Sequence, residues 1–388
     1  MAGKPLIGGT AYDITGGNTL VSGTSYSVKG GKVLVSGTEY DISFIKGPLV
    51  DVWTGSANDT IMCIAYADGY WVVGGRCYDG STNQARIAYS TDLINWTTKD
   101  LWSGTSACVN CITYADGYWV AGGYSVSSSY YAKLAYATSL SGTWYTKNVW
   151  TKSYEANITS VAYGNGYWVV SGRYDDGTES GYYGTIAYAT SPSGTWYTKN
   201  LTSSKASIFN DVTYANGYWV AVGKHYISGN YYATVAYIGV PTSTWYISYA
   251  WGNSSSSTTA TSITYANGYY VMGGRCQYNS LDYSTIAYTT NPNAEWTTKY
   301  LAGGSVGQVI NSITYANGYW AYGGHEYVLY NTSPSDSVTI KHFLNYFDSI
   351  QCIAYANGCW VVGGRLYSDS TYHARIFFDE SNSPFDNL

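Results

Sequence analysis

The chain has 388 residues, of which 11% are charged and 18% aromatic, and its formal net charge is −5. Tyrosine (46), glycine (44) and tryptophan (15) dominate, which excludes a disordered chain and disfavours a helical one, because these residues suit strands and turns. The acidic balance argues against nucleic acid as a partner. No apolar run reaches membrane-spanning length, and the start, MAGKPLIGGTAYDI, lacks the pattern of a signal peptide.

The first 44 residues contain a repeat of fourteen residues. LIGGTAYDI, LVSGTSYSV and LVSGTEYDI begin at Leu6, Leu20 and Leu34 and are separated by GG or KGG turns. Each unit alternates and predicts a small β-hairpin, but three such hairpins are too small to enclose a core. We therefore expect residues 1–44 to form an attachment or oligomerisation module, ordered on a partner or on copies of itself, rather than a flexible tail.

Residues 45–388 repeat one phrase seven times, as in SITYANGYW at Ser312 and CIAYADGYW at Cys63. The glycine of each phrase lies 48, 49, 51, 51, 50 and 40 residues after the previous one, at Gly69, Gly117, Gly166, Gly217, Gly268, Gly318 and Gly358. Periods near fifty residues are typical of solenoids, propellers or arrays.

The third period shows what each repeat builds. From Ser160 the segments SVAYG, YWVVSGR, TIAYAT and TWYTKNL alternate as strands do, and Asn165-Gly166 is a strong hairpin turn. Four short antiparallel strands per period form one propeller blade. The sequence therefore predicts an all-β fold: a seven-bladed β-propeller preceded by a short β-hairpin repeat module.

Two irregularities complete this prediction. The seventh period ends after three strands, whereas PLVDVWTG before the first period matches the ends of the fourth strands, KDLW and KNVW. We expect residues 49–53 to pair with residues 374–379 and to close the ring without a free edge. The short sixth interval comes from an almost absent loop between the second and third strands, which predicts a notch beside His325.

The phrases AYANGYWVVGG and IAYATSPSGTW resemble the BNR or Asp-box repeats of sialidase-like propellers, over residues 49–378. The turn is degenerate, because only Asp92 in YSTDLINW keeps the aspartate. That class is common in phage and bacterial surface proteins, and the N-terminal units are similar to glycine-threonine-tyrosine repeats of phage tail and fibre proteins. The resemblance implies a virion protein, made in the host cytoplasm, whose residues 1–44 bind other virion proteins.

Candidate binding residues lie on the face of the long loops, since binding sites favour variable loops. The position after each GG-type pair holds Arg76, Tyr124, Arg173, Lys224, Arg275, His325 and Arg365. These cations either hold an anionic glycan group or stack on aromatic rings and pair with a loop aspartate such as Asp79 or Asp175. Around the expected notch, Tyr278, Tyr283 and Tyr367 join them. Trp53, Trp102, Trp150 and Trp251 end fourth strands, where they either stack on sugars or pack between blades.

No enzyme motif emerges. A sialidase needs an arginine triad and converging carboxylates, but the glutamates are scattered, and the inner strands are expected to present small residues: Ala65, Thr113, Ala162, Thr213, Thr264, Thr314 and Ala354. The seven cysteines lack zinc or disulfide spacing and are interpreted as buried thiols. We expect no metal and no cofactor.

These observations favour a non-enzymatic adhesion protein of a phage surface or tail fibre that recognises a host-surface polysaccharide, with a homo-oligomer as one assembly that the N-terminal module would allow. The alternatives are a sialidase-like glycoside hydrolase and a purely structural decoration protein of the virion.

Overall fold

The computed structural model describes six short strands between residues 6 and 42 and then residues 49–386, without 56–57, 153, 176, 178–180, 203–205, 254, 256, 280, 306–308 and 344–345. Every regular element in this part of the chain is a β-strand, as the composition predicts. Within it, no helical segment has the length and apolarity needed to cross a membrane.

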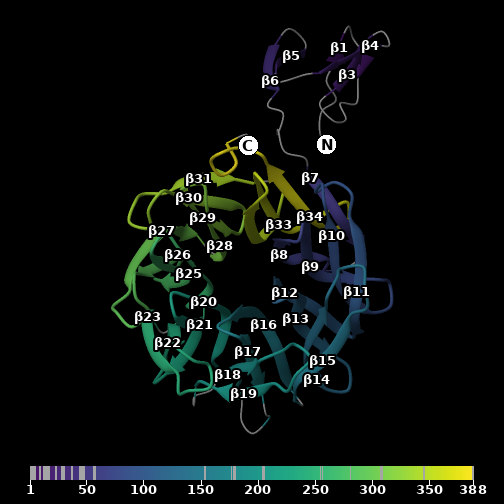
Figure 1. Cartoon of the computed structure of the whole chain (residues 1–388). Helices are drawn as coiled ribbons and strands as arrows, with labels where there is room; N and C mark the ends of the chain where they lie inside the picture. Colours follow the sequence, from purple (N-terminus) through teal and green to yellow (C-terminus); the bar gives the residue numbers. More distant parts are fainter. Residues whose placement is uncertain are drawn as a thin grey trace.

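Seven four-stranded antiparallel sheets follow one another around a central axis, which confirms the predicted seven-bladed propeller (Figure 1). Each blade begins with an inner strand: β8 (Thr60–Ala67), β12 (Ser106–Ala115), β16 (Glu155–Gly164), β20 (Ile208–Ala215), β24 (Thr259–Ala266), β28 (Ile310–Ala316) and β32 (Ser349–Ala356). The second strands are β9 (Tyr70–Tyr78), β13 (Tyr118–Val126), β17 (Tyr167–Asp175), β21 (Tyr218–Ile227), β25 (Tyr269–Tyr278), β29 (Tyr319–Gly324) and β33 (Cys359–Ser368).

The outer half of each blade consists of a third and a fourth strand. The third strands are β10 (Asn83–Ser90), β14 (Tyr130–Ala137), β18 (Tyr183–Ala189), β22 (Asn230–Ile238), β26 (Leu281–Thr289), β30 (Tyr327–Asn331) and β34 (Thr371–Asp379). The fourth strands are β11 (Thr97–Gly104), β15 (Tyr145–Lys152), β19 (Tyr197–Asn200), β23 (Tyr246–Asn253), β27 (Thr297–Ser305), β31 (Thr339–His342) and, for blade 7, β7 (Leu49–Gly55).

Strand β7 closes the ring from the other end of the chain. It pairs antiparallel with β34, with Trp53 opposite Ala374 and Leu49 opposite Phe377. This is the pairing that the missing seventh outer strand predicts. Val52 and Trp53 are buried in the core cluster that blades 7 and 1 share, so the closure is packed as well as hydrogen-bonded.

Each fourteen-residue unit of the N-terminal segment contains one antiparallel strand pair. The pairs are β1 (Leu6–Ile7) with β2 (Thr10–Ala11), β3 (Asn18–Val21) with β4 (Thr24–Ser27), and β5 (Gly31–Val35) with β6 (Thr38–Ile42). The hairpin of each unit is therefore present. The boundary between residues 44 and 45 lies outside the described residues, and the attachment role stays a prediction.

Three structural features that recur in the blades explain why this sequence motif is repeated seven times. Its turn needs positive φ twice, as at Asn165 (46°) and Gly166 (77°). The large aromatic residue that follows the turn fills the space between blades. In blade 3 this residue is Trp168, which is fully buried and whose ring centre lies 5.0 Å from that of Tyr163. The later glycine is required because a Cβ on Gly172 would lie 2.0 Å from the carbonyl oxygen of Asn157.

That close approach marks a β-bulge in every inner strand. In blade 3, Ile158 pairs with Gly172 and Ser160 with Ser171, so Thr159 is the extra residue. The same register shift occurs in the other six blades, and the extra residues are Met62, Asn110, Asn210, Thr261, Asn311 and Gln351. A bulge turns its extra side chain away from the regular alternation.

The hairpin of blade 6 is short, as the sequence predicts, because only His325 and Glu326 separate β29 from β30. The linker after β31 contacts this tip: the backbone N of Phe343 donates to the carbonyl oxygen of Glu326 at 2.7 Å. The rings of Phe343 and Phe347 are buried between blades 6 and 7. Phe343 and Phe347 therefore pack beside the shortened hairpin, where the sequence predicts a notch.

Candidate functional site

The seven bulge residues meet in the central channel. They line a cavity of about 310 Å³ together with Asn157, Arg173 and Ile208, and a deeper cavity of about 230 Å³ continues along the inner strands. Of the small residues expected on these strands, only Thr113 is among those lining the cavities. That expectation was wrong because the extra residue of each bulge changes which side chains of the inner strand face the channel.

Five bulge side chains hydrogen-bond to the next blade. Asn110 Nδ2 donates to the carbonyl of Ile158 at 2.7 Å, and Thr159 Oγ1 donates to that of Phe209 at 2.6 Å. The same contact links Asn210 to Ala260, Thr261 to Ile310 and Asn311 to Ile350. Met62 has no donor, and Gln351 donates to Ser349 within its own blade. The polar ring is thus rigid around most of the channel.

Three of the predicted cations gather beside this channel on blades 3, 4 and 5. Arg173 lines the cavity, and Lys224 and Arg275 occupy the same position on the next two blades. Burial, together with the nearby charges of Arg173 and Arg275, lowers the pKa of Lys224. Lys224 therefore lies within electrostatic range of both arginines.

The cations are stabilised by rings and acids, but not by the acids named from the sequence. The guanidinium of Arg173 lies 4.5 Å from the centre of the Tyr182 ring and pairs with Glu155. Lys224 lies 5.3 Å from the Tyr231 ring. Arg275 pairs with Asp282 at 3.3 Å. Among the described contacts, a ring contact at Arg173 and at Lys224, though not at Arg275, matches the cation–π stacking that was one of the two interpretations of this position.

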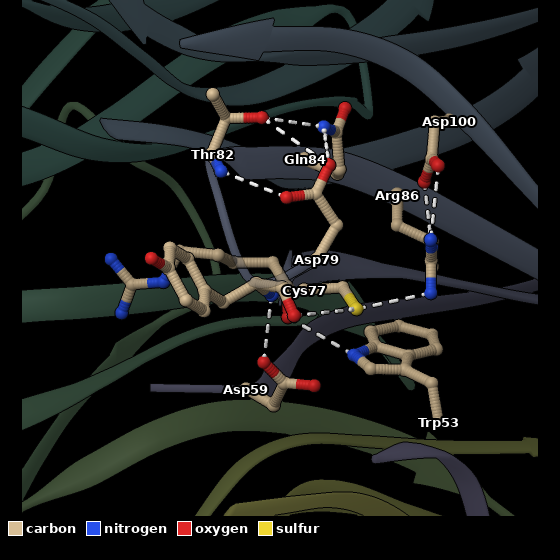
Figure 2. Close-up of polar contacts among 10 residues, drawn as sticks. Trp53, Asp59, Cys77, Asp79, Thr82, Gln84, Arg86 and Asp100 are labelled. Carbon is tan, nitrogen blue, oxygen red and sulfur yellow. Dashed lines mark hydrogen bonds and ion pairs between the residues drawn. The ribbon is translucent and has the colours of Figure 1, made fainter. Parts of the chain in front are cut away.

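Asp79 and Asp175, the acids expected to pair with these arginines, instead stabilise their own loops. Asp79 accepts from the backbone of Ser81. It also accepts from the backbone of Thr82 and from the Gln84 amide (Figure 2). These bonds lower the pKa of the Asp79 carboxyl. Asp175 accepts from the backbone of Gly177. Arg76 in turn donates to the carbonyl of Asn58.

The tryptophans at the ends of fourth strands are structural. Trp102, Trp150 and Trp251 are 9%, 7% and 7% exposed. Each indole N–H donates to the carbonyl of the residue at the cation position, from Trp102 to Tyr124, from Trp150 to Arg173 and from Trp251 to Arg275. Trp53 makes the same bond to Arg76 (Figure 2). With little ring surface exposed, they do not offer stacking platforms, and we leave them out of the candidate site.

The remaining predicted residues lie on separate hairpins of blades 5, 6 and 7. Tyr278 and Tyr367 are 62% and 52% exposed, and Tyr283 packs edge-on against Tyr300 at 5.6 Å. His325 lies 3.8 Å from Glu326. The guanidinium of Arg365 lies 5.6 Å from the Tyr372 ring. No described contact joins these residues to the cluster around Arg173.

Asp211 is the one acid among the residues that line the two cavities. Its neighbours at the same position in other blades are serines or thiols, including Cys63, Cys111 and Cys352. The structure shows no disulfide among the seven cysteines, all of which it describes, and six of them are buried, which fits their interpretation as small apolar groups. Sequence reasoning missed Asp211, although it is the only acid at its position in the sevenfold repeat.

No family model matches the chain, and no curated protein matches it in sequence. Solved propellers share its fold. YCF48, solved bound to D1 peptide, has a TM-score of 0.52 at 10% identity, covering 87% of this chain and 97% of that one. The WD40 domain of Neurospora crassa Pan2 has a TM-score of 0.50 at 9% identity, covering 84% and 91%. A Trypanosoma rangeli sialidase has a TM-score of 0.50 at 12% identity, covering 81% of this chain and 60% of that one. At these identities the likeness shows the fold alone.

Proposed function

We propose that the propeller is a non-enzymatic binding module whose channel mouth, on the long-loop face, holds an acidic group of a host-surface polysaccharide. The observation that carries the proposal is the position of Arg173 in the wall of a cavity of about 310 Å³, with Lys224 and Arg275 at the same position on the next two blades. Ligand sites are commonly concave and of this size, and guanidinium groups suit carboxylate or phosphate.

The wider role that we propose is adhesion, as part of a phage surface or tail fibre. The N-terminal hairpin units are the proposed attachment to other virion proteins. This part rests on the sequence resemblance and on the composition of the long loops, which combine tyrosine with serine, asparagine and glycine as adaptable binding surfaces do.

A sialidase-like hydrolase is the first alternative. Glycoside hydrolysis uses two carboxylates that flank the scissile bond. Asp211 is the one acid lining the described channel, and three hydrogen bonds hold its two oxygens. This arrangement favours binding over catalysis. A peptide ligand is the second candidate, because the YCF48 propeller was solved with a peptide.

The test is a glycan array probed with the full chain and with Lys224→Met. We expect acidic glycans to be bound, with affinity about tenfold lower in the variant and reduced in both proteins at high salt, because exposed charges are screened within about 8 to 10 Å. Lys133→Met, on the third strand of blade 2, is the matched control. Equal binding by Lys224→Met, or binding of neutral glycans alone, would contradict the proposal.

A further inference from the structure

A second set of aromatic residues lies on the opposite face, beside the short turns. The fourth strands of blades 2, 3 and 4 begin with Tyr145, Tyr197 and Tyr246, which are 59%, 59% and 62% exposed. Large apolar rings with this exposure on three successive blades are not explained by packing of the core.

Each exposed ring ends a ladder of three tyrosines across its blade. In blade 3, Tyr197 stacks on Tyr188 with ring centres 5.7 Å apart and planes at 29°, and Tyr188 meets Tyr167 edge-on at 6.3 Å. Blade 2 repeats this with Tyr145, Tyr136 and Tyr118, and blade 4 with Tyr246, Tyr237 and Tyr218. The inner two rings hold the outer ring in a fixed orientation.

Three other blades show that the fold does not need the outer ring. Blades 1, 5 and 6 keep the inner pair, such as Tyr70 with Tyr89 at 5.9 Å. The residue opposite the third-strand tyrosine is Thr97, Thr297 or Thr339 in these blades. Threonine therefore suffices for strand pairing at this position, so pairing alone does not require the tyrosines of blades 2, 3 and 4.

In blade 3 the ladder forms the wall of a cavity of about 440 Å³. The other lining residues are Ala189, Thr190, Thr195 and Thr242, the last from the turn of blade 4. No lining residue is charged. The nearby ammonium of Lys199 lies 5.8 Å from the Tyr188 ring and donates to the carbonyls of Thr242 and Ser243.

We propose that this cavity, the blade 3 platform, binds a pyranose unit of a neutral polysaccharide. The apolar C–H face of a sugar ring stacks on tyrosine, while its hydroxyls match the hydroxyls of the three threonines that also line the cavity. A cavity without charged lining residues suits an uncharged ligand. This site is distinct from the channel mouth in face, residues and ligand charge.

The repetition supports a polymer as ligand. Stacked tyrosine pairs at the same position on blades 2, 3 and 4 present similar surfaces at regular intervals around the ring. A chain of repeating sugars can engage more than one of them, and linked weak contacts then add to a much tighter attachment.

The test is affinity electrophoresis of the full chain in gels that contain dextran, mixed-linkage β-glucan, mannan or galactan. We expect at least one polysaccharide to slow the protein, and to do so equally at about 0.5 M NaCl, because stacking is not screened by salt. Tyr197→Thr should weaken the retardation roughly tenfold, and the triple change of Tyr145, Tyr197 and Tyr246 to threonine should abolish it.

Threonine is the residue that the fold itself uses at this position, so these variants should keep their thermal stability. Tyr278→Thr and Tyr367→Thr remove tyrosines of similar exposure from the other face and should leave the retardation unchanged. Absence of retardation in all four gels would overturn the inference, as would full retardation of the triple variant. Loss of acidic-glycan binding on the array would affect only the proposed channel site.

Discussion

Asp211 joins three blades through one carboxyl group. Its Oδ1 accepts from Ser160 Oγ of blade 3 at 2.7 Å and from its own neighbour Val212 N at 2.9 Å, and its Oδ2 accepts from Ile263 N of blade 5 at 2.8 Å. Burial raises the pKa of this carboxyl, although these hydrogen bonds oppose the shift. The surroundings of Asp211 therefore disfavour its charged form.

The first prediction follows from that raised pKa. The folded state holds the Asp211 proton more tightly than the unfolded state, so this group's contribution to stability is greatest at low pH and falls as pH rises through the folded pKa. Asp211→Ser should remove this loss while keeping an acceptor for the next blade, since Ser262 accepts Ile313 N in blade 5.

The measurement is urea unfolding of both proteins at about pH 4 and pH 7. The other carboxylates titrate alike in the two proteins, so their effect cancels in the difference between the two unfolding free energies. The variant should gain stability relative to the wild type between the two pH values. A relative loss over that interval would contradict the raised pKa of Asp211.

At the scale of strands, an arginine–aspartate pair holds third and fourth strands together in two blades. Arg86 contacts Asp100 at 2.6 Å in blade 1 (Figure 2). Arg375 contacts Asp51 at 2.8 Å in blade 7. The positions correspond, but only the blade 7 pair joins the two ends of the propeller. Asp51 also lies 3.0 Å from His373.

The second prediction compares these pairs. Asp51→Ala and Asp100→Ala should each cost about 1 to 2 kcal/mol, because each leaves a largely buried guanidinium without its partner, while the exposed carboxylate side moderates the loss. Only Asp51→Ala should also speed amide hydrogen exchange in β7, since no hairpin loop joins that strand to β34. Equal exchange of β7 in the two variants would show that the closure does not depend on this pair.

Lysines of the fourth strands join adjacent blades in a second way. Lys99, Lys147, Lys199 and Lys299 each donate to two carbonyls in the short turn of the next blade, as Lys147 does to Ser193 and Gly194. The sequence shows the recurrent lysine, but the partner lies on another blade about 40 residues away. Only the assembled ring reveals this contact.

At the scale of the molecule, the ring is closed by one strand from the N-terminal side. The third prediction is that removing residues 1–44 leaves a folded propeller, whereas removing residues 1–55 lowers Tm by about 10 °C or more. The second deletion removes buried Val52 and Trp53, and loss of a buried tryptophan alone costs about 3 to 5 kcal/mol. Calorimetry of the two deletion proteins makes the comparison, and equal Tm values would refute the closure.

The sequence by itself determined the blade count, the strand order and the closing strand. These features depend on local chemistry that repeats: Asn-Gly turns that accept positive φ, alternating strands, and the VDVW end that matches its counterparts. Where a short residue pattern determines its own backbone conformation, the conformation can be predicted without knowing which residues lie nearby in space.

Only the tertiary structure decided which side chains share a site. Side chains alternate with a period of two, so one bulged residue moved Met62, Asn110 and Thr159 into the channel, and nothing local in the sequence marked that shift. Likewise, the gathering of Arg173 with Lys224 and the stacking of Tyr197 beside Thr242 depend on the angle between blades. That angle is set by the buried rings that fill the space between sheets, a packing property of the whole ring.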